Sequence, residues 1–207
     1  GLPLAVRFSL KGFDVNGYDI NEERVNQLTD NIDINNDIPK KNLKNLTKNC
    51  NLTSNLNEIE QCNIYIVTVP TPINDDKTPD LKPLISSSEL VGSIMKKGSI
   101  VIYESTVYPG VTDEICTPVL EEKSNLIFNE EFSTGYSPER IVPGDSVNTI
   151  EKIKKVVSGS NKNTLEVISF LYSSIIDAGI YEAPSIKVAE AAKVTENIQR
   201  DVNIALI

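Results

Sequence analysis

Apolar runs of strand length alternate with stretches of helical periodicity along most of the chain. Residues 63–69 (NIYIVTV) and 99–105 (SIVIYES) are nearly continuous runs of apolar and β-branched residues, which is typical of strands covered on both faces. Further strands are predicted at residues 13–20 and 156–158, and a short one should end at Pro184. This alternation predicts an α/β fold, a Rossmann-like doubly wound parallel sheet.

Helices are predicted between these strands, at the start of the chain, at 22–28 and at 164–177. Asp80 is expected to cap a helix that has Pro83 in its first turn, and Thr112 to cap the next, because short polar side chains satisfy free N–H groups at helix starts. Residues 31–56 are rich in Asn, Lys and Asp. They are predicted to form a polar connection with one short helix near residues 40–48.

The most strongly periodic helix is predicted for residues 185–207, with Ser185 as its cap. One apolar stripe runs along it, formed by Ala191, Val194, Ile198, Val202 and Ala205. A polar stripe on a neighbouring face contains Glu190, Lys193, Asn197 and Arg200. The helix has no C-cap residue within the sequence. We therefore expect a sheet domain over residues 1–184, a long helix that starts at 185, and a further domain beyond it.

Composition and charge exclude several classes of function. The 207 residues are 40% hydrophobic and carry a net charge of −9, whereas a nucleic-acid binder presents a basic face. No histidine is present, which rules out Ser-His or Cys-His catalysis and imidazole ligation of a metal within this chain. Cys50, Cys62 and Cys116 are too scattered for a zinc site or a disulfide framework. No run of about eighteen apolar residues suggests a membrane span, so we expect a cytoplasmic domain.

The start of the chain has the spacing of a dinucleotide-binding unit. In such units the last glycine of the fingerprint lies at a helix start, and an acidic residue follows roughly twenty residues later. Gly1 and Asp19 fit this spacing, and Asp19 would bind the ribose hydroxyls and repel the extra phosphate of NADP. An Asp at a strand end is also a common turn former, so a structural role stays open. In the cofactor interpretation, the first strand and first two glycines precede residue 1.

Four strings then occur in a fixed order: residues 69–72 (VPTP), 104–110 (ESTVYPG), 135–140 (GYSPER) and 187–197 (KVAEAAKVTEN). Together they resemble the UDP-glucose/GDP-mannose dehydrogenase family, in particular its UDP-N-acetylhexosamine 6-dehydrogenase branch. The resemblance covers nearly the whole chain except the Asn-rich stretch.

The resemblance implies oxidation of the C6 hydroxymethyl group of a UDP-N-acetylhexosamine to a carboxylate, with two NAD reduced in succession, in the synthesis of surface polysaccharide precursors. The intermediate aldehyde is captured by a cysteine as a thiohemiacetal, oxidised to a thioester and hydrolysed. That cysteine should lie in the domain after the long helix, and none of the three in this chain fits. The resemblance also implies a homodimer formed through the long helix, and a chain that is inactive without the missing part.

Residue roles follow from the same resemblance. Thr106 resembles the threonine that contacts nicotinamide and helps to hold the catalytic water, and Glu139 the glutamate that orders water and substrate. Lys193 resembles the lysine that stabilises oxyanion character, and Asn197 the asparagine that binds this oxygen or the water. The implied cofactor contacts are Gly1, Asp19, Arg24, Val69, Pro70, Thr71, Ser105 and Thr106. The implied substrate contacts are Glu139, Arg140, Lys193, Asn197 and Arg200.

One departure and two alternatives stand beside this interpretation. Relatives that act on UDP-glucose carry a second acidic residue four positions after the active-site glutamate, where this chain has Pro143, which favours the amino-sugar branch. A β-hydroxyacid dehydrogenase of the 6-phosphogluconate type also joins a Rossmann domain to a long helix with Lys and Asn. A non-catalytic NAD-binding module is the other alternative, and the Lys193–Asn197 pattern by itself also suits an exposed charged helix face.

Overall fold

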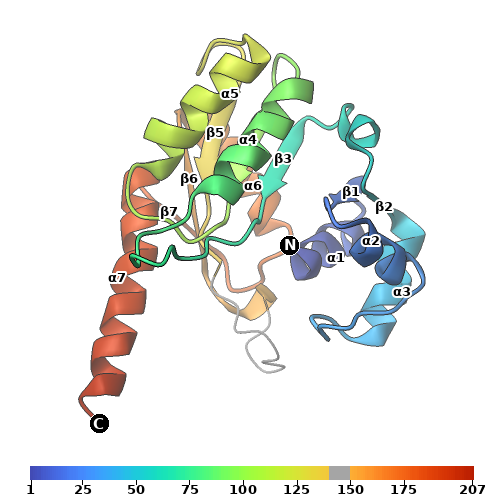
Figure 1. Cartoon of the computed structure of the whole chain (residues 1–207), viewed down its shortest axis with the longest axis horizontal. Coiled ribbons are helices and arrows are strands. Elements are labelled where there is room, and N and C mark those ends of the chain that lie inside the picture. Colours follow the sequence, from blue (N-terminus) through green and yellow to red (C-terminus); the bar gives the residue numbers. More distant parts are fainter. Residues whose placement is uncertain (140–149) are drawn as a thin grey trace.

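The computed structural model describes residues 1–139 and 150–207, which form a three-layer α/β structure (Figure 1). Five strands pair in the order β3-β4-β5-β6-β7. Their bounds are Ile64–Val67 (β3), Ile100–Tyr103 (β4), Ser133–Tyr136 (β5), Lys155–Gly159 (β6) and Ile180–Glu182 (β7). The strands β3, β4 and β5 are parallel, as are β6 and β7, while β5 and β6 are antiparallel. The predicted α/β class is confirmed, with one antiparallel pairing added.

Strands β1 (Val15–Tyr18) and β2 (Cys50–Thr53) form a separate parallel pair. This pair lies with helices α1, α2 and α3 on one side of the molecule (Figure 1). The helices are α1 (Leu2–Leu10), α2 (Glu22–Thr29), α3 (Lys40–Asn49), α4 (Lys82–Ile94), α5 (Thr117–Ser124), α6 (Lys162–Ser173) and α7 (Ile186–Ala205). Single helical turns occur at Leu56–Ile59 (η1), Thr112–Cys116 (η2) and Ile150–Lys152 (η3).

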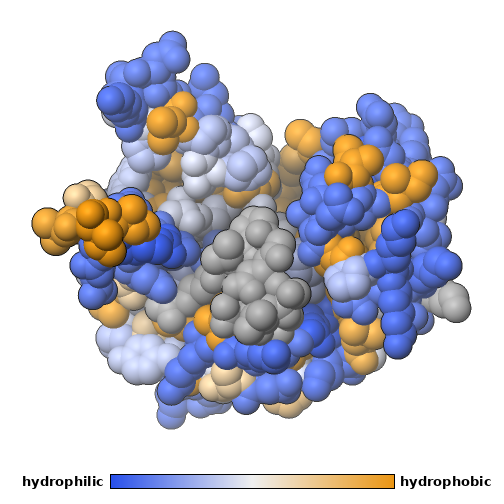
Figure 2. Space-filling model, turned by 90° about the horizontal axis from the view of Figure 1, so that it is seen from below, coloured by the Kyte–Doolittle hydropathy of each residue, from blue (hydrophilic) through white to orange (hydrophobic). Residues whose placement is uncertain are grey.

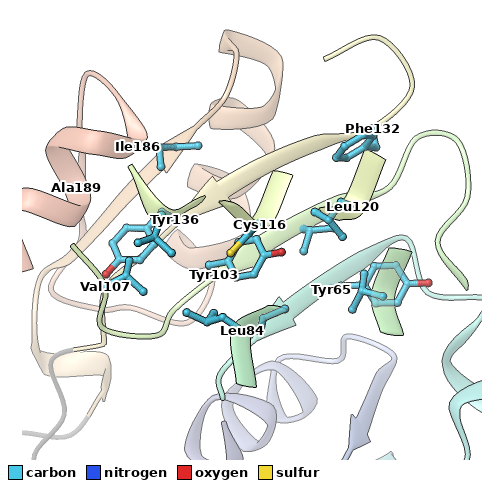
Figure 3. Packing of buried hydrophobic residues seen from close by; sticks show 14 of the residues in the cluster. Tyr65, Leu84, Tyr103, Val107, Cys116, Leu120, Phe132, Tyr136, Ile186 and Ala189 are labelled. Atoms are coloured by element: carbon cyan, nitrogen blue, oxygen red, sulfur yellow. The ribbon is translucent and has the colours of Figure 1, made fainter. Parts of the chain in front are cut away.

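Two apolar clusters cover the two faces of the five-stranded sheet. On one face α4, α5 and the first turn of α7 pack over Tyr103, Cys116 and Tyr136, each of which is at most 1% exposed (Figure 3). On the other face α1 and α6 pack over Ile102 and Val157. Because β4, β5 and β6 are buried on both faces and β3 is buried or half-buried along its length, these strands lack the apolar–polar alternation of a half-exposed sheet. This explains why the continuous apolar runs at residues 63–69 and 99–105 predict strands correctly.

The structure corrects several local predictions. Strands β2 (CNLT) and β5 (STGY) were missed because small and polar residues fill them. Leu81, not Asp80, is the N-cap of α4, although the Asp80 carboxylate accepts a hydrogen bond from the Lys82 N–H at 2.9 Å. Thr112 does not cap a helix either, because its hydroxyl donates to Glu190.

The cap of the long helix is confirmed. Ser185 accepts a hydrogen bond from the Val188 N–H at 3.3 Å, and α7 runs from Ile186 to Ala205. Within the described residues, no helix combines the length and the hydropathy needed to cross a bilayer.

Candidate active site

Two loops at the carboxyl edge of the sheet are tied to each other. The Ser105 hydroxyl, just after β4, donates to the Val69 carbonyl at 2.6 Å. In return the Thr71 hydroxyl donates to the Thr106 carbonyl at 2.8 Å. Thr106 itself is exposed, as is Pro70 in the facing loop. Five predicted cofactor residues therefore lie in one hydrogen-bonded pair of loops, at the edge where open parallel sheets bind their ligands.

Helix α7 brings Lys193 to the same edge. The Lys193 ammonium group donates to the main-chain carbonyl of Glu139 at 2.6 Å. Glu139 is half-buried and lies three residues beyond the end of β5, in the segment that starts with the buried Ser137 and Pro138. Two residues predicted to act together, 54 positions apart in sequence, are therefore in contact.

Asn197 is half-buried one helical turn beyond Lys193 and accepts a hydrogen bond of 2.6 Å from Arg200. Arg200 is exposed toward the free end of α7, so the structure joins it to Asn197 and not to the loops at the sheet edge. Arg140 and Pro143 lie outside the described residues.

A buried carboxylate on α7 holds this helix against the loop after β4. Glu190 is fully buried and accepts three hydrogen bonds: from the Gly110 N–H (2.6 Å), the Thr112 N–H (3.0 Å) and the Thr112 hydroxyl (2.7 Å). Burial raises the pKa of the Glu190 carboxyl above its ordinary value, although these hydrogen bonds work in the opposite direction. Glu190 lies three residues before Lys193, so the contact fixes where Lys193 meets the sheet edge. Glu190 belongs to the polar stripe predicted from the sequence, but its spacing alone indicates no role for it.

A second buried polar group lies beneath Ser105 and Thr106. Glu104 accepts from the Lys155 ammonium at 2.8 Å and from the Tyr172 hydroxyl, and all three residues are at most 4% exposed. The ammonium also lies 5.3 Å from the centre of the Tyr172 ring. Burial, together with the charge of Glu104, raises the pKa of Tyr172 well above its ordinary value, so this hydroxyl remains a donor. No local pattern predicts this cluster, because its members are 17 to 68 positions apart in the chain.

The predicted adenosine side of the cofactor site is a cavity of about 570 Å³ whose lining includes Gly1, Asp19 and Arg24. Gly1 is the N-cap of α1, and a Cβ atom there would come 2.5 Å from the Thr68 Oγ1 atom at the end of β3. Any larger residue at position 1 would therefore force the Thr68 side chain to shift. Asp19 follows β1 and is exposed, with one carboxylate oxygen held by the Asn21 N–H at 2.9 Å.

The rest of this cavity separates two strand edges. Its walls include Val15 and Gly17 of β1, Ile64 and Ile66 of β3, and Phe8 of α1. Among residues 1–139 and 150–207, no strand pairs with β1 or β3 on the sides that face the cavity. A strand that ran into Gly1 would end beside Thr68 and so would be parallel to both edges.

The three cysteines have the surroundings of structural thiols. Burial raises the pKa of Cys50 and of Cys116 to about 11, and it also raises the pKa of Cys62. A raised pKa lowers the thiolate fraction at neutral pH, which supports the expectation that the nucleophile lies elsewhere. Within residues 1–139 and 150–207, no group of acidic residues and cysteines is arranged to hold a metal ion.

Comparison with known proteins decides the family. The family model described as "UDP-glucose/GDP-mannose dehydrogenase family, NAD binding domain" matches residues 1–176. This chain belongs to that family. The resemblance seen in the four sequence strings is thus confirmed, and the cavity beside Gly1, Asp19 and Arg24 lies in an NAD-binding domain.

Relatives of this family domain are UDP-N-acetylhexosamine dehydrogenases. Over its whole length the chain is 55% identical to UDP-N-acetyl-D-glucosamine 6-dehydrogenase of Pseudomonas aeruginosa, of which it covers 49%, and 51% identical to that of Salmonella typhi, of which it covers 48%. The structure of UDP-D-ManNAc dehydrogenase from Pyrococcus horikoshii superimposes on the whole chain with a TM-score of 0.91, at 31% identity and 49% coverage of that protein. The chain therefore spans about half the length of the relatives that it matches.

Proposed function

We propose that this chain is the cofactor-binding half of an NAD-dependent UDP-N-acetylhexosamine 6-dehydrogenase. The enzyme oxidises the C6 hydroxymethyl group to a carboxylate in two steps and reduces two NAD, and its product serves as a precursor of surface polysaccharide. The observation that carries the proposal is the contact between Lys193 and the Glu139 carbonyl beside the loop of Thr106. An exposed charged helix face would not direct its lysine to the carboxyl edge of the sheet.

The residues of the cavity fit NAD. The N-terminus of the nine-residue helix α1 is uncapped by any side chain and starts at a glycine, which suits a pyrophosphate group. The Asp19 carboxylate, at the end of β1, is placed to accept hydrogen bonds from ribose hydroxyls. When bound, NAD supplies the hydride acceptor. The loop of Val69–Thr71 would contact the cofactor on its adenosine–ribose side, and Thr106 in the loop after β4 would contact the nicotinamide.

The polar residues at the carboxyl edge of the sheet assist the reaction at C6 of the sugar. The Lys193 ammonium stabilises negative charge that develops on the C6 oxygen, and the Asn197 amide binds the same oxygen or the water that hydrolyses the acyl intermediate. Glu139 and Thr106 orient that water and the substrate. The hydrogen bonds of Glu190 to Gly110 and Thr112 fix the position of α7, and so of Lys193, relative to the loop that contains Thr106.

The remaining parts of the proposal concern the whole protein. Residues 1–184 form the NAD-binding domain, whose slot between β1 and β3 receives a parallel strand that precedes Gly1. Helix α7 continues into a second domain that supplies the nucleophilic cysteine and most of the sugar and uridine pocket. We also propose a cytoplasmic location, which the three free cysteines support.

A homodimer formed through α7 completes the proposal. Ile198, Val202 and Ile204 on this helix are more than half exposed, and hydrophobic residues project at its free end on the left of Figure 2. Such exposed apolar side chains are typical of a surface covered in an assembly.

The test is product stoichiometry in a protein that joins this chain to its missing parts. UDP-N-acetyl-D-glucosamine is the first substrate to test, with the manno and galacto epimers beside it. Two NADH per sugar and a product carboxylate are expected, whereas one NADH per molecule of a simple hydroxyacid would favour the β-hydroxyacid dehydrogenase. Binding of NAD and UDP-sugar with no NADH would favour a non-catalytic module. Ordinary turnover by residues 1–207 alone would show that the missing cysteine is not the nucleophile.

A further inference from the structure

Arg24 is held by two carboxylates at the edge of the adenosine cavity. Its Nη2 atom lies 2.7 Å from the Asp33 Oδ1 atom and 3.2 Å from the Asp37 Oδ2 atom. The side chains of Arg24 and Asp33 are 13% and 5% exposed, so this pairing is largely shielded from water. Arg24, Asp37 and Asp19 all line the same cavity. The two carboxylates on its Nη2 atom therefore offset the charge of the guanidinium at the edge of the cavity.

The two carboxylates are fixed by the fold. Asp33 also accepts a hydrogen bond from the Ile38 N–H at 3.2 Å, and Ile38 is buried in the apolar cluster of α1, α2 and α3. Burial alone would raise the pKa of Asp33, but the hydrogen bonds and charge of Arg24, with the N–H groups of Ile38 and Asp37, outweigh it and lower the pKa. Asp33 is thus a stable anion beside Arg24.

This arrangement bears on the choice between NAD and NADP. An arginine near the ribose is the group that accommodates the 2′-phosphate of NADP. Here one cation (Arg24) pairs with two anions (Asp33 and Asp37), and the Asp19 carboxylate lines the same cavity, so these four groups carry a formal net charge of −2. If Arg24 turned to a phosphate, it would leave the Asp33 carboxylate buried without its partner, and such a loss is costly.

We propose that Asp33 and Asp37 are specificity-determining residues that keep Arg24 from binding a 2′-phosphate. They add to the repulsion expected from Asp19, and they make the site selective for the unphosphorylated ribose. This inference rests on the proposed function, because it assumes that the cavity binds the adenosine half of NAD.

The experiment measures equilibrium binding of two nicotinamide-free probes, ADP-ribose and 2′-phospho-ADP-ribose, to the whole protein by calorimetry. The wild type should bind ADP-ribose and discriminate strongly against the phosphorylated probe. The side chain of Asp37 is 35% exposed, so Asp37→Asn should be tolerated by the fold. This variant should reduce the dissociation constant of 2′-phospho-ADP-ribose, divided by that of ADP-ribose, by about tenfold. The double variant Asp33→Asn, Asp37→Asn should reduce this ratio further. Affinity for ADP-ribose itself should change by less than about twofold. The increase in affinity of the variants for 2′-phospho-ADP-ribose should be smaller at high salt, because salt screens the charges.

Asp30→Asn is the matched control, because Asp30 is exposed at the end of the same helix and lies outside the Arg24 ion pairs. The ratio of the two dissociation constants of Asp30→Asn should equal that of the wild type. The inference is overturned if the ratio of the two dissociation constants is unchanged in both Asp37→Asn and the double variant. It is also overturned if the variants lose affinity for both probes equally, because the carboxylates would then only stabilise the fold. If the wild type binds neither probe, the proposed function fails as well. Wild-type binding of ADP-ribose with an unshifted ratio in the variants rejects this inference alone.

Discussion

The Lys193 ammonium group lies 2.6 Å from the main-chain carbonyl oxygen of Glu139. This hydrogen bond joins the last helix of the chain to the segment after β5, at the edge of the sheet where β4 also ends. This charged donor on a main-chain carbonyl acceptor holds the Lys193 ammonium group in place at the sheet edge. The position suits a cation that must stabilise an oxyanion.

Lys193→Met should abolish most of the activity of the whole enzyme. It removes the charge but keeps an unbranched side chain, and loss of an electrostatic stabiliser lowers kcat by about 10²–10³-fold. We expect this loss in NADH production with little change in thermal stability. Lys187→Met is the control, because Lys187 is an exposed lysine on the same helix that pairs with Glu114 instead. Equal activity of the two variants would remove Lys193 from the mechanism.

The buried pair of Glu104 and Lys155 predicts a non-additive effect on stability. Lys155→Met leaves the Glu104 carboxylate buried without its cation, which costs about 3–5 kcal/mol of unfolding free energy. The double variant with Glu104→Gln should recover most of this loss. Urea denaturation of the two single variants and the double variant measures the coupling. A double variant as unstable as Lys155→Met would show that the two charges do not depend on each other.

Glu190 predicts a pH dependence of stability. Burial raises the pKa of Glu190 above its ordinary value of 4.5, so the folded state binds this proton more tightly than the unfolded state. Its contribution is therefore full below about pH 4.5 and is lost as the pH rises through the folded-state pKa. The unfolding free energy of the wild type should fall relative to that of Glu190→Gln as the pH rises above about 4.5. Urea denaturation at several pH values tests this, and a difference that is constant or grows with pH contradicts it.

The exposed stripe of α7 predicts how the whole protein assembles. Val202→Glu places a charge on a side chain that is 51% exposed in this chain and that we expect to be buried between subunits. Sedimentation should show a dimer for the wild type and a shift to monomer for the variant at micromolar concentration. Asn203→Glu adds the same charge to the same helix off the apolar stripe, and it should remain dimeric. If Val202→Glu also remains dimeric, α7 is not the interface.

Much of this protein is determined locally and is therefore visible in its sequence. The apolar run over residues 63–69 marks a strand because a doubly covered strand needs apolar side chains on both faces. Ser185 marks the start of α7 because its hydroxyl satisfies a nearby N–H group. The four ordered strings, which include those around Thr106 and Lys193, pointed to the family because each is a short contiguous stretch of sequence.

Only the tertiary structure shows what depends on distant parts of the chain. Strand β5, with the sequence STGY, exists because β4 and β6 provide its hydrogen bonds, and its side chains give little indication of a strand. The pairings of Glu190 with Gly110, of Glu104 with Lys155 and of Arg24 with Asp33 likewise need the fold to bring them together. The sequence determined which residue types were available and where the helices and buried strands begin. The fold determined which charges are buried and paired, because burial and Coulomb attraction depend on distances in space.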